Sequence, residues 1–221
     1  MKKSSQFAVV LSGCGFQDGA EIHESVLTLL AITKVGAGYQ CFAPDMDQVQ
    51  VVNHLTGKKI SDKRNVLVES ARIARGRIKP LSEFDEVPFD AIIFPGGFGA
   101  AMNLCTFAVD GEHCRIQPDV EKAVRAMHKA KKPIGVLCIA PVIVAQLLKG
   151  VELTLGQDQA VHEKVRKMGA VTKNTSHGQV VVDQENRVVS TPCYMLDSTV
   201  ADIVLGAENL VKAVMDLIDK K

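Results

Sequence analysis

The chain has 221 residues, of which 47% are hydrophobic and 23% charged, and its formal charge at pH 7 is +1. These values are typical of a globular protein with one sizeable core, and they predict a single domain over residues 1–221. Basic residues are dispersed, so the sequence lacks the basic patch of a nucleic-acid-binding protein. No apolar run is long enough to span a membrane. We therefore expect neither nucleic acid nor membrane as a partner.

Short apolar runs alternate with segments of helical periodicity along the whole chain. This alternation is typical of βαβ units around a mainly parallel sheet, and it predicts an α/β protein. We expect strands at 7–11, 40–42, 90–94, 134–137 and 151–155, helices at 21–35, 120–130, 140–148, 159–168 and 196–218, and a small β-hairpin formed by 179–182 and 187–190.

Residues 53–77 interrupt this alternation, and we interpret them as an inserted or lengthened connection that contains an arginine-rich amphipathic helix. Two interpretations stay open for its polar residues. They form a solvated helix face with capping residues, or they line the ligand pocket and bind an anionic group. The residues in question are Asn53, His54, Arg64, Arg72 and Arg75.

Six cysteines lie far apart in the chain and form no CxxC pair. In a chain of this length they do not indicate a disulfide framework, and a reducing, cytoplasmic location is predicted. Cys105 and Cys114 flank Glu112 and His113, but their spacing matches no standard zinc motif, so no metal is expected.

Cys138 stands between the predicted strand 134–137 and the predicted helix that begins at about residue 140. A nucleophile elbow holds its residue in such a strand-to-helix turn, where the N-terminus of the helix lowers the pKa of a thiol. The alternative is a buried cysteine that packs as a small apolar residue. The local sequence leaves both interpretations open.

Two further loops lie where parallel strands end, which is where ligands bind in open α/β sheets. Pro95-Gly96-Gly97 follows a strand directly, and its backbone N–H groups could form an oxyanion hole or only a tight turn. Glu24 lies near the start of the first helix, where an acid serves as a catalytic partner or simply stabilises the helix dipole.

Taken together, these loops carry several long motifs: LSGCGFQDGAEIHE, CFAPD, NHLTG, ARIARG, PGGFGAAMNL, CIAP and TPCYML. The chain resembles the ElbB-like proteins, also called isoprenoid-biosynthesis proteins with amidotransferase-like domain or sigma cross-reacting proteins. They form part of the PfpI-like branch of the class I glutamine-amidotransferase-like superfamily. The resemblance spans nearly the whole chain and implies a flavodoxin-like, doubly wound, mainly parallel sheet with a nucleophile elbow.

The resemblance also implies roles for individual residues. Cys138 takes the elbow position, Glu24 faces the thiol, and the N–H groups of Gly97 and Ile139 form the oxyanion hole. Further residues are candidates for the pocket: Gly96, Cys14, His23, Asn53, His54 and Arg72. No cofactor is implied.

One departure from the superfamily concerns histidine. Hydrolytic members place a histidine after the next strand, but here that segment reads LTLGQDQAV, and STPCYML near the end has none. His177 precedes Gly-Gln and does not fit the pattern, and His162 is a remote candidate only. Because an amidase needs both a base and an acid for the leaving amine, glutaminase and protease activity are not expected.

A cysteine with one carboxyl partner can still act on a small dicarbonyl, which has no leaving group. ElbB-like proteins are associated with weak conversion of glyoxal to glycolate, and this activity is our expectation for the chain. The alternative is a non-catalytic regulatory or redox-sensing protein that uses the same cysteine. A homodimer is expected from the base rate for soluble oligomers.

Overall fold

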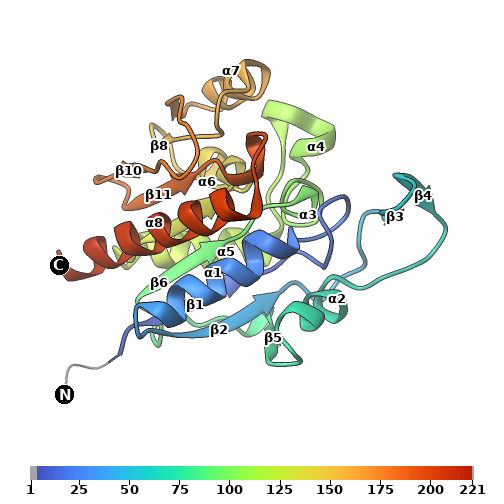
Figure 1. Cartoon of the computed structure of the whole chain (residues 1–221), viewed down its shortest axis with the longest axis horizontal. Helices are drawn as coiled ribbons and strands as arrows, with labels where there is room; N and C mark the ends of the chain where they lie inside the picture. The colour runs from blue at the N-terminus through green and yellow to red at the C-terminus, as the bar shows by residue number, and fades with distance from the viewer. Residues whose placement is uncertain (1–3, 221) are drawn as a thin grey trace.

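The structure is a computed structural model that describes residues 4–220. A seven-stranded sheet runs through it in the order β10-β11-β7-β6-β1-β2-β5 (Figure 1). Its strands are β1 Gln6–Val10, β2 Gly38–Ala43, β5 Ile78–Pro80, β6 Ala91–Phe94, β7 Ile134–Leu137, β10 Val181–Asp183 and β11 Val188–Thr191. All neighbouring strands are parallel except β10 and β11. The flavodoxin-like, mainly parallel fold is confirmed.

Helices cover both faces of this sheet, and α1 and α8 lie side by side across one of them (Figure 1). The helices are α1 Ile22–Lys34, α2 Val66–Ile73, α3 Phe98–Met102, α4 Phe107–Asp110, α5 Pro118–Lys129, α6 Pro141–Leu147, α7 Gln159–Lys167 and α8 Val200–Asp219. Among residues 4–220 there are also three 3₁₀ turns: η1 Leu81–Glu83, η2 Gly111–His113 and η3 Cys193–Met195. Within residues 4–220, no helix is both long and apolar enough to cross a membrane.

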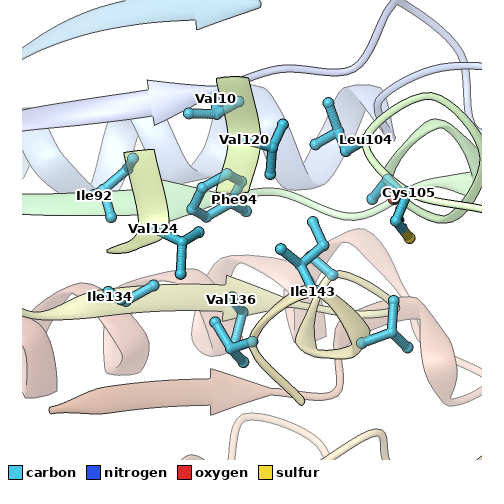
Figure 2. Close-up of a cluster of buried hydrophobic side chains, with 14 of the residues drawn as sticks. Val10, Ile92, Phe94, Leu104, Cys105, Val120, Val124, Ile134, Val136 and Ile143 are labelled. Carbon is cyan, nitrogen blue, oxygen red and sulfur yellow. Dashed lines mark hydrogen bonds between the residues drawn. The ribbon is translucent and has the colours of Figure 1, made fainter. Parts of the chain in front are cut away.

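The central strands are apolar on both sides, because each side is covered by helices. In β1, Phe7 and Val9 point into the cluster beneath α1 and α8, while Ala8 and Val10 point into the opposite cluster. Figure 2 shows this second cluster, in which side chains of β1, β6 and β7 meet those of α5 and α6. The labelled members from these elements are Val10, Ile92, Phe94, Ile134, Val136, Val120, Val124 and Ile143.

Two predicted elements differ from the structure. The strand expected at 151–155 is only β8 Glu152–Leu153, which pairs with β9 Val171–Thr172 in a separate two-stranded sheet. The last helix begins at residue 200 and not at 196, because η3 forms first and Thr199 with Asp202 makes a capping box. The predicted hairpin is present as β10 and β11.

The segment predicted as an insertion contains a second hairpin, of β3 Val51–Asn53 and β4 Lys58–Ile60, which projects from the body of the molecule (Figure 1). The arginine-rich helix is shorter than expected: α2 ends at Ile73, and Arg75 and Gly76 both take positive φ values. The chain then adds β5 to the edge of the main sheet beside β2, a strand that the sequence pattern did not reveal.

Candidate active site around Cys138 and Glu24

Cys138 occupies a sharp turn between β7 and α6. Its φ is +58°, in the left-handed region that residues with a β-carbon rarely adopt. The turn is held by the Cys138 N–H, which donates to the carbonyl oxygen of Thr191 at 3.0 Å at the end of the neighbouring strand β11. The residue is 7% exposed. This is the geometry of a nucleophile elbow.

The loop after β6 lies directly against this cysteine. A β-carbon added to Gly96 would lie 2.9 Å from Sγ of Cys138, so only glycine fits there. Gly97 has a φ of +93°, and its N–H and that of Ile139 both donate hydrogen bonds to the Cys138 sulfur. Two backbone donors on one sulfur favour negative charge there. They occupy the positions expected for an oxyanion hole.

Glu24 is the carboxyl partner of Cys138. Its side chain is completely buried against the thiol of Cys138, since a β-carbon on Gly96 would lie 2.6 Å from Oε2 of Glu24 and 2.9 Å from Sγ of Cys138. The N–H of Gly96 donates to Oε2 at 2.9 Å and the N–H of Tyr194 donates to Oε1 at 3.2 Å. The first turn of α1, the loop after β6 and the turn η3 therefore converge on one carboxyl group.

Burial changes the acidity of both groups. It raises the pKa of Glu24 to about 8, and the negative charge of Glu21 adds to this effect. Burial also raises the pKa of Cys138 well above its usual value, and the charge on Glu24 contributes. Glu24 therefore gains and loses its proton near neutral pH, next to a thiol that holds its own proton.

Two residues of this site were not among the predicted ones. Glu21 caps α1, and its Oε2 accepts the N–H of Glu24 at 2.7 Å. Tyr194 contributes its N–H to Glu24, and its hydroxyl oxygen lies 2.8 Å from Nδ1 of His23. His23, a predicted pocket residue, is thus at the outer edge of the site, with its side chain 52% exposed. Glu21 could have been recognised as an acidic helix cap, but nothing in the sequence indicated a role for the backbone of Tyr194.

The remaining predicted pocket residues gather around the loop that follows β1. Cys14 lies beside Glu69 and Arg72, and burial followed by the charge of Glu69 raises its pKa. The Nε of Arg72 donates to Oε2 of Glu69 at 2.9 Å, so its charge is already paired. The side chain of Asn53 accepts the N–H of Leu55 at 3.0 Å within its own turn.

His54 anchors the projecting hairpin to this loop. Its Nε2 accepts the N–H of Gln17 at 3.3 Å, which leaves Nδ1 to donate to the carbonyl oxygen of Val52 at 3.1 Å. The loop after β1 is joined in turn to the loop after β6, which contains Gly97 and which we call the oxyanion loop. The N–H of Phe98 donates to the carbonyl oxygen of Phe16 at 2.7 Å. The insertion therefore reaches the Cys138 site through this loop, and His54 contacts both the loop and its own hairpin.

The segment after β8, where hydrolytic members of the superfamily carry a histidine, holds Thr154 and Gly156 instead. After β8, Thr154 is buried and its hydroxyl oxygen lies 2.7 Å from that of Thr175. Gly156 follows with a φ of +79°, and a β-carbon there would lie 3.1 Å from a methyl group of Leu196. His162 is fully buried on α7, and neither ring nitrogen has a hydrogen-bond partner among residues 4–220. Burial lowers its pKa.

Two cavities lie away from Cys138 and Glu24, and the described residues hold no cluster of side chains suited to a metal. A cavity of about 560 Å³ lies between α8 and the segment before β10, and another of about 320 Å³ lies beside Tyr39 and Arg77. Neither is lined by Cys138 or Glu24. No group of three or more His, Cys, Asp or Glu side chains suited to a metal occurs in the described part of the chain.

Known proteins match the chain over nearly its full length. It is 44% identical over 226 residues to the rat ES1 protein homolog, mitochondrial, covering 98% of this chain and 85% of the relative. It is 43% identical over 229 residues to human glutamine amidotransferase-like class 1 domain-containing protein 3, mitochondrial, covering 99% and 85%. No model of a protein family matches the chain.

Comparison with solved structures leads to the same family of proteins. The crystal structure of an isoprenoid biosynthesis protein with amidotransferase-like domain from Ehrlichia chaffeensis superposes with a TM-score of 0.89 at 36% identity, covering 96% of this chain and 99% of that one. The ElbB-like resemblance is thereby confirmed. Glyoxalase III from Candida albicans shares the fold alone, with a TM-score of 0.60 at 14% identity over 97% of this chain and 96% of that one.

The comparisons correct one prediction. A cytoplasmic location was expected, but both the rat and the human relative are mitochondrial proteins, and this finding contradicts the expectation. The expectation depended on cysteine spacing. That spacing indicates whether thiols stay reduced, and it does not identify the compartment in which they do so.

Proposed function

Because the chain belongs to the ES1 family of ElbB-like, glutamine amidotransferase-like proteins, we propose that it is a cofactor-independent glyoxalase that converts glyoxal to glycolate at Cys138. The observation that carries this proposal is the close approach of the buried Glu24 carboxyl group to the Cys138 thiol, in which each group shifts the pKa of the other. A general base works best when its pKa lies near the working pH and it can reach the proton that it removes. Glu24 meets both conditions without a histidine.

The first step joins the sulfur to the substrate. The carboxylate of Glu24 takes the thiol proton while the Cys138 sulfur attacks one aldehyde carbon of glyoxal, and the C=O π electrons move to the oxygen. The N–H groups of Gly97 and Ile139 stabilise the oxyanion. Glu24 then gives its proton to that oxygen, which leaves a hemithioacetal and a carboxylate.

The second step moves one hydrogen between the two carbons and one between the two oxygens. Glu24 removes the proton from the carbon that carries the sulfur, and the C–H electrons form the C=C bond of an enediolate whose charge lies on the former aldehyde oxygen. The hydroxyl proton of the first carbon passes to that oxygen, and Glu24 returns its proton to the neighbouring carbon as the C=O bond forms at the first. The product is a thioester of glycolate on Cys138. Water attacks this thioester, the C–S bond breaks, and glycolate leaves with the thiol restored. One glyoxal and one water give one glycolate, and no electron acceptor is needed.

The substrate class follows from what the site lacks. An amide needs an acid that protonates its leaving amine, whereas an aldehyde adds a thiol with no leaving group. The elbow is also largely closed, with Cys138 only slightly exposed, which favours a molecule as small as glyoxal. A small dicarbonyl is therefore the proposed substrate, and the homodimer expected from the sequence stays a prediction.

The alternative is a regulatory protein that senses oxidant at Cys138. Such a sensor needs an accessible thiol with a low pKa. Burial works against both requirements here, because it hides Cys138 and raises the pKa of its thiol. The geometry therefore favours the enzyme over this alternative.

The test is glycolate formation from glyoxal by the purified full chain. We expect Cys138→Ala to abolish it and Glu24→Gln to lower it by about 100-fold or more, since each removes a reacting group. Cys41→Ala is the matched control, because Cys41 is a buried cysteine in β2 and should leave the rate unchanged. Glyoxal consumption that continues unchanged in Cys138→Ala would refute the proposal.

A further inference from the structure

A second pair of thiols lies outside the Cys138 site, in the segment that links α3 to α5. Cys105 and Cys114 are free cysteines, and each is 2% exposed. Both belong to the core cluster on the α5 side of the sheet, and Figure 2 shows Cys105 at the edge of this cluster beside Leu104. The proposed function makes no use of them.

Backbone pairing holds the two cysteines together. Cys105 lies opposite Ile116 in an antiparallel bridge, which is closed by hydrogen bonds from Thr106 N–H to Arg115 at 3.0 Å and from Gln117 N–H to Leu104 at 2.9 Å. Cys114 has extended backbone angles and precedes Ile116 by two residues, so its side chain lies on the same side as Ile116. The two thiols are accordingly neighbours on one side of the bridge, and each is the largest influence on the pKa of the other.

Their surroundings make the two thiols unequal. The S–H of Cys105 donates to the carbonyl oxygen of Ala100 at 3.3 Å. The contact with Cys105 lowers the pKa of Cys114, whereas the contact with Cys114 and burial raise that of Cys105. In the other four cysteines, burial raises the pKa of the thiol. Cys114 is therefore the thiol that ionises most readily, and it has a second thiol as its neighbour.

We propose that Cys105 and Cys114 form a reversible disulfide bond and so are a redox-modification site of this protein. The oxidant is a peroxide. The Cys114 thiolate attacks one peroxide oxygen, the O–O bond breaks, and Cys114 becomes a sulfenic acid. The Cys105 thiol then attacks this sulfur and water leaves. Two thiols are oxidised by two electrons, and hydrogen peroxide is reduced to two molecules of water.

The oxidant has a short route to the pair. The residues on either side of Cys114, His113 and Arg115, are both exposed at the surface. The turn η2 that precedes Cys114 is one 3₁₀ turn, and its three residues are all at least partly exposed. Opening of such a short surface segment costs far less than global unfolding, so it exposes Cys114 without loss of the fold.

The pair is also connected to the oxyanion loop. Ala100, which accepts the S–H of Cys105, belongs to α3, and Gly97 is the N-cap of that helix. A disulfide removes this S–H donor and fixes the start of the linking segment. We therefore expect disulfide formation to change the alkylation rate of Cys138 by at least about twofold, because the helix that follows Gly97 loses one of its hydrogen bonds.

Peptide mapping tests the disulfide directly. The purified full chain is treated with hydrogen peroxide, remaining thiols are blocked, and the protein is cleaved after glutamate without reduction. Because Glu112 lies between the two cysteines, cleavage there separates them, and only a disulfide keeps the two peptides together. We expect a linked species two hydrogen masses below the sum of the two peptides, which separates when dithiothreitol is added.

Matched variants assign the bond. We expect the linked peptide to persist in Cys138→Ala and in Cys41→Ser, and to disappear in Cys105→Ser and Cys114→Ser. The two latter variants keep a polar group of similar size, and their circular dichroism spectra report whether they fold. The proposal is overturned if peroxide modifies other cysteines of the wild type while Cys105 and Cys114 are recovered as blocked free thiols. Equal alkylation of Cys138 before and after oxidation would overturn the connection to the oxyanion loop.

Discussion

Gly96 and Cys138 lie so close together that a side chain on Gly96 has no room. A β-carbon there would lie 2.9 Å from the sulfur of Cys138 and 2.6 Å from Oε2 of Glu24. This close approach lets the N–H of Gly96 hold the carboxyl group of Glu24 while the thiol lies against the same backbone. The glycine is therefore a structural requirement of the Cys138–Glu24 pair.

Gly96→Ala should damage the site more than it damages the fold. The methyl group must displace Glu24 or Cys138, and overpacking of this kind costs about 1–3 kcal/mol of unfolding free energy. We expect glycolate formation to fall by at least about tenfold, measured beside urea unfolding. Gly135→Ala is the control, because a β-carbon there meets the flexible end of Leu210 at 2.9 Å, in the strand β7 but outside the site. Equal activity in the two variants would contradict the prediction.

Glu24 should make stability fall as the pH rises. Its pKa in the folded protein is about 8, against 4.5 as its ordinary value, so between these values the folded state holds a proton that the unfolded state has lost. Each step up in pH across this range therefore lowers the free energy of unfolding. Glu24→Gln removes this dependence, so wild type should lose on the order of 3–4 kcal/mol more than the variant between pH 5 and pH 8. Urea unfolding at both pH values measures the difference, and parallel losses would show that Glu24 does not titrate as described.

The reactivity of Cys138 should depend on the charge of Glu24. Burial raises the pKa of the thiol, and ionised Glu24 raises it further. Glu24→Gln removes the second contribution, so alkylation of Cys138 by iodoacetamide should begin at lower pH in the variant. The rate is followed by mass spectrometry of the Cys138 peptide between pH 6 and pH 10. The Cys41 peptide is the internal control, since burial alone raises the pKa of Cys41 to about 12. Identical pH profiles for Cys138 in both proteins would argue against this coupling.

Much of the fold could be predicted because its strands and helices carry strong local patterns. β7 was expected at 134–137 and lies there, since four apolar residues precede the turn at Cys138. β5 was missed because its three residues, IKP, carry no alternation, and β2 alone selects them as an edge strand. The start of α8 was misplaced because η3 competes for the residues before Thr199.

The site shows the same division between local and long-range signals. The elbow could be proposed because Cys138 lies between a predicted strand and a predicted helix, and the resemblance to ElbB-like proteins then selected it over a packed cysteine. The donor to Glu24 from Tyr194 could not be predicted, because a backbone N–H has no sequence signature and the two residues are 170 positions apart. Pairing of Arg72 with Glu69 has a local signal by contrast, because the two residues are three positions apart on α2 and so lie on the same face of the helix.

Asp18 should hold the projecting hairpin in place. Its carboxylate is 2% exposed; Oδ2 accepts the N–H of Val52 at 2.7 Å, and Oδ1 lies 3.8 Å from Nε2 of His54. Asp18→Ala leaves the N–H of Val52 without its partner, which costs about 1–3 kcal/mol because that N–H is buried. Much of this cost should appear as local opening, because β3 and β4 pair only with each other.

Limited trypsin digestion measures this opening, since Lys58 and Lys59 lie in β4. We expect cleavage at these lysines to be at least about fivefold faster in Asp18→Ala than in wild type, because a cost of 1.4 kcal/mol corresponds to roughly tenfold in the open population. Asp62→Ala is the matched control: Asp62 is an exposed acid in the same segment, 3.9 Å from Arg64, and its loss should leave the rate unchanged.

Asp18→Asn keeps an oxygen that can accept the N–H of Val52 and should restore most of the protection. If Asp18→Ala and Asp62→Ala are cleaved at the same rate, the hairpin is held by contacts other than those of Asp18.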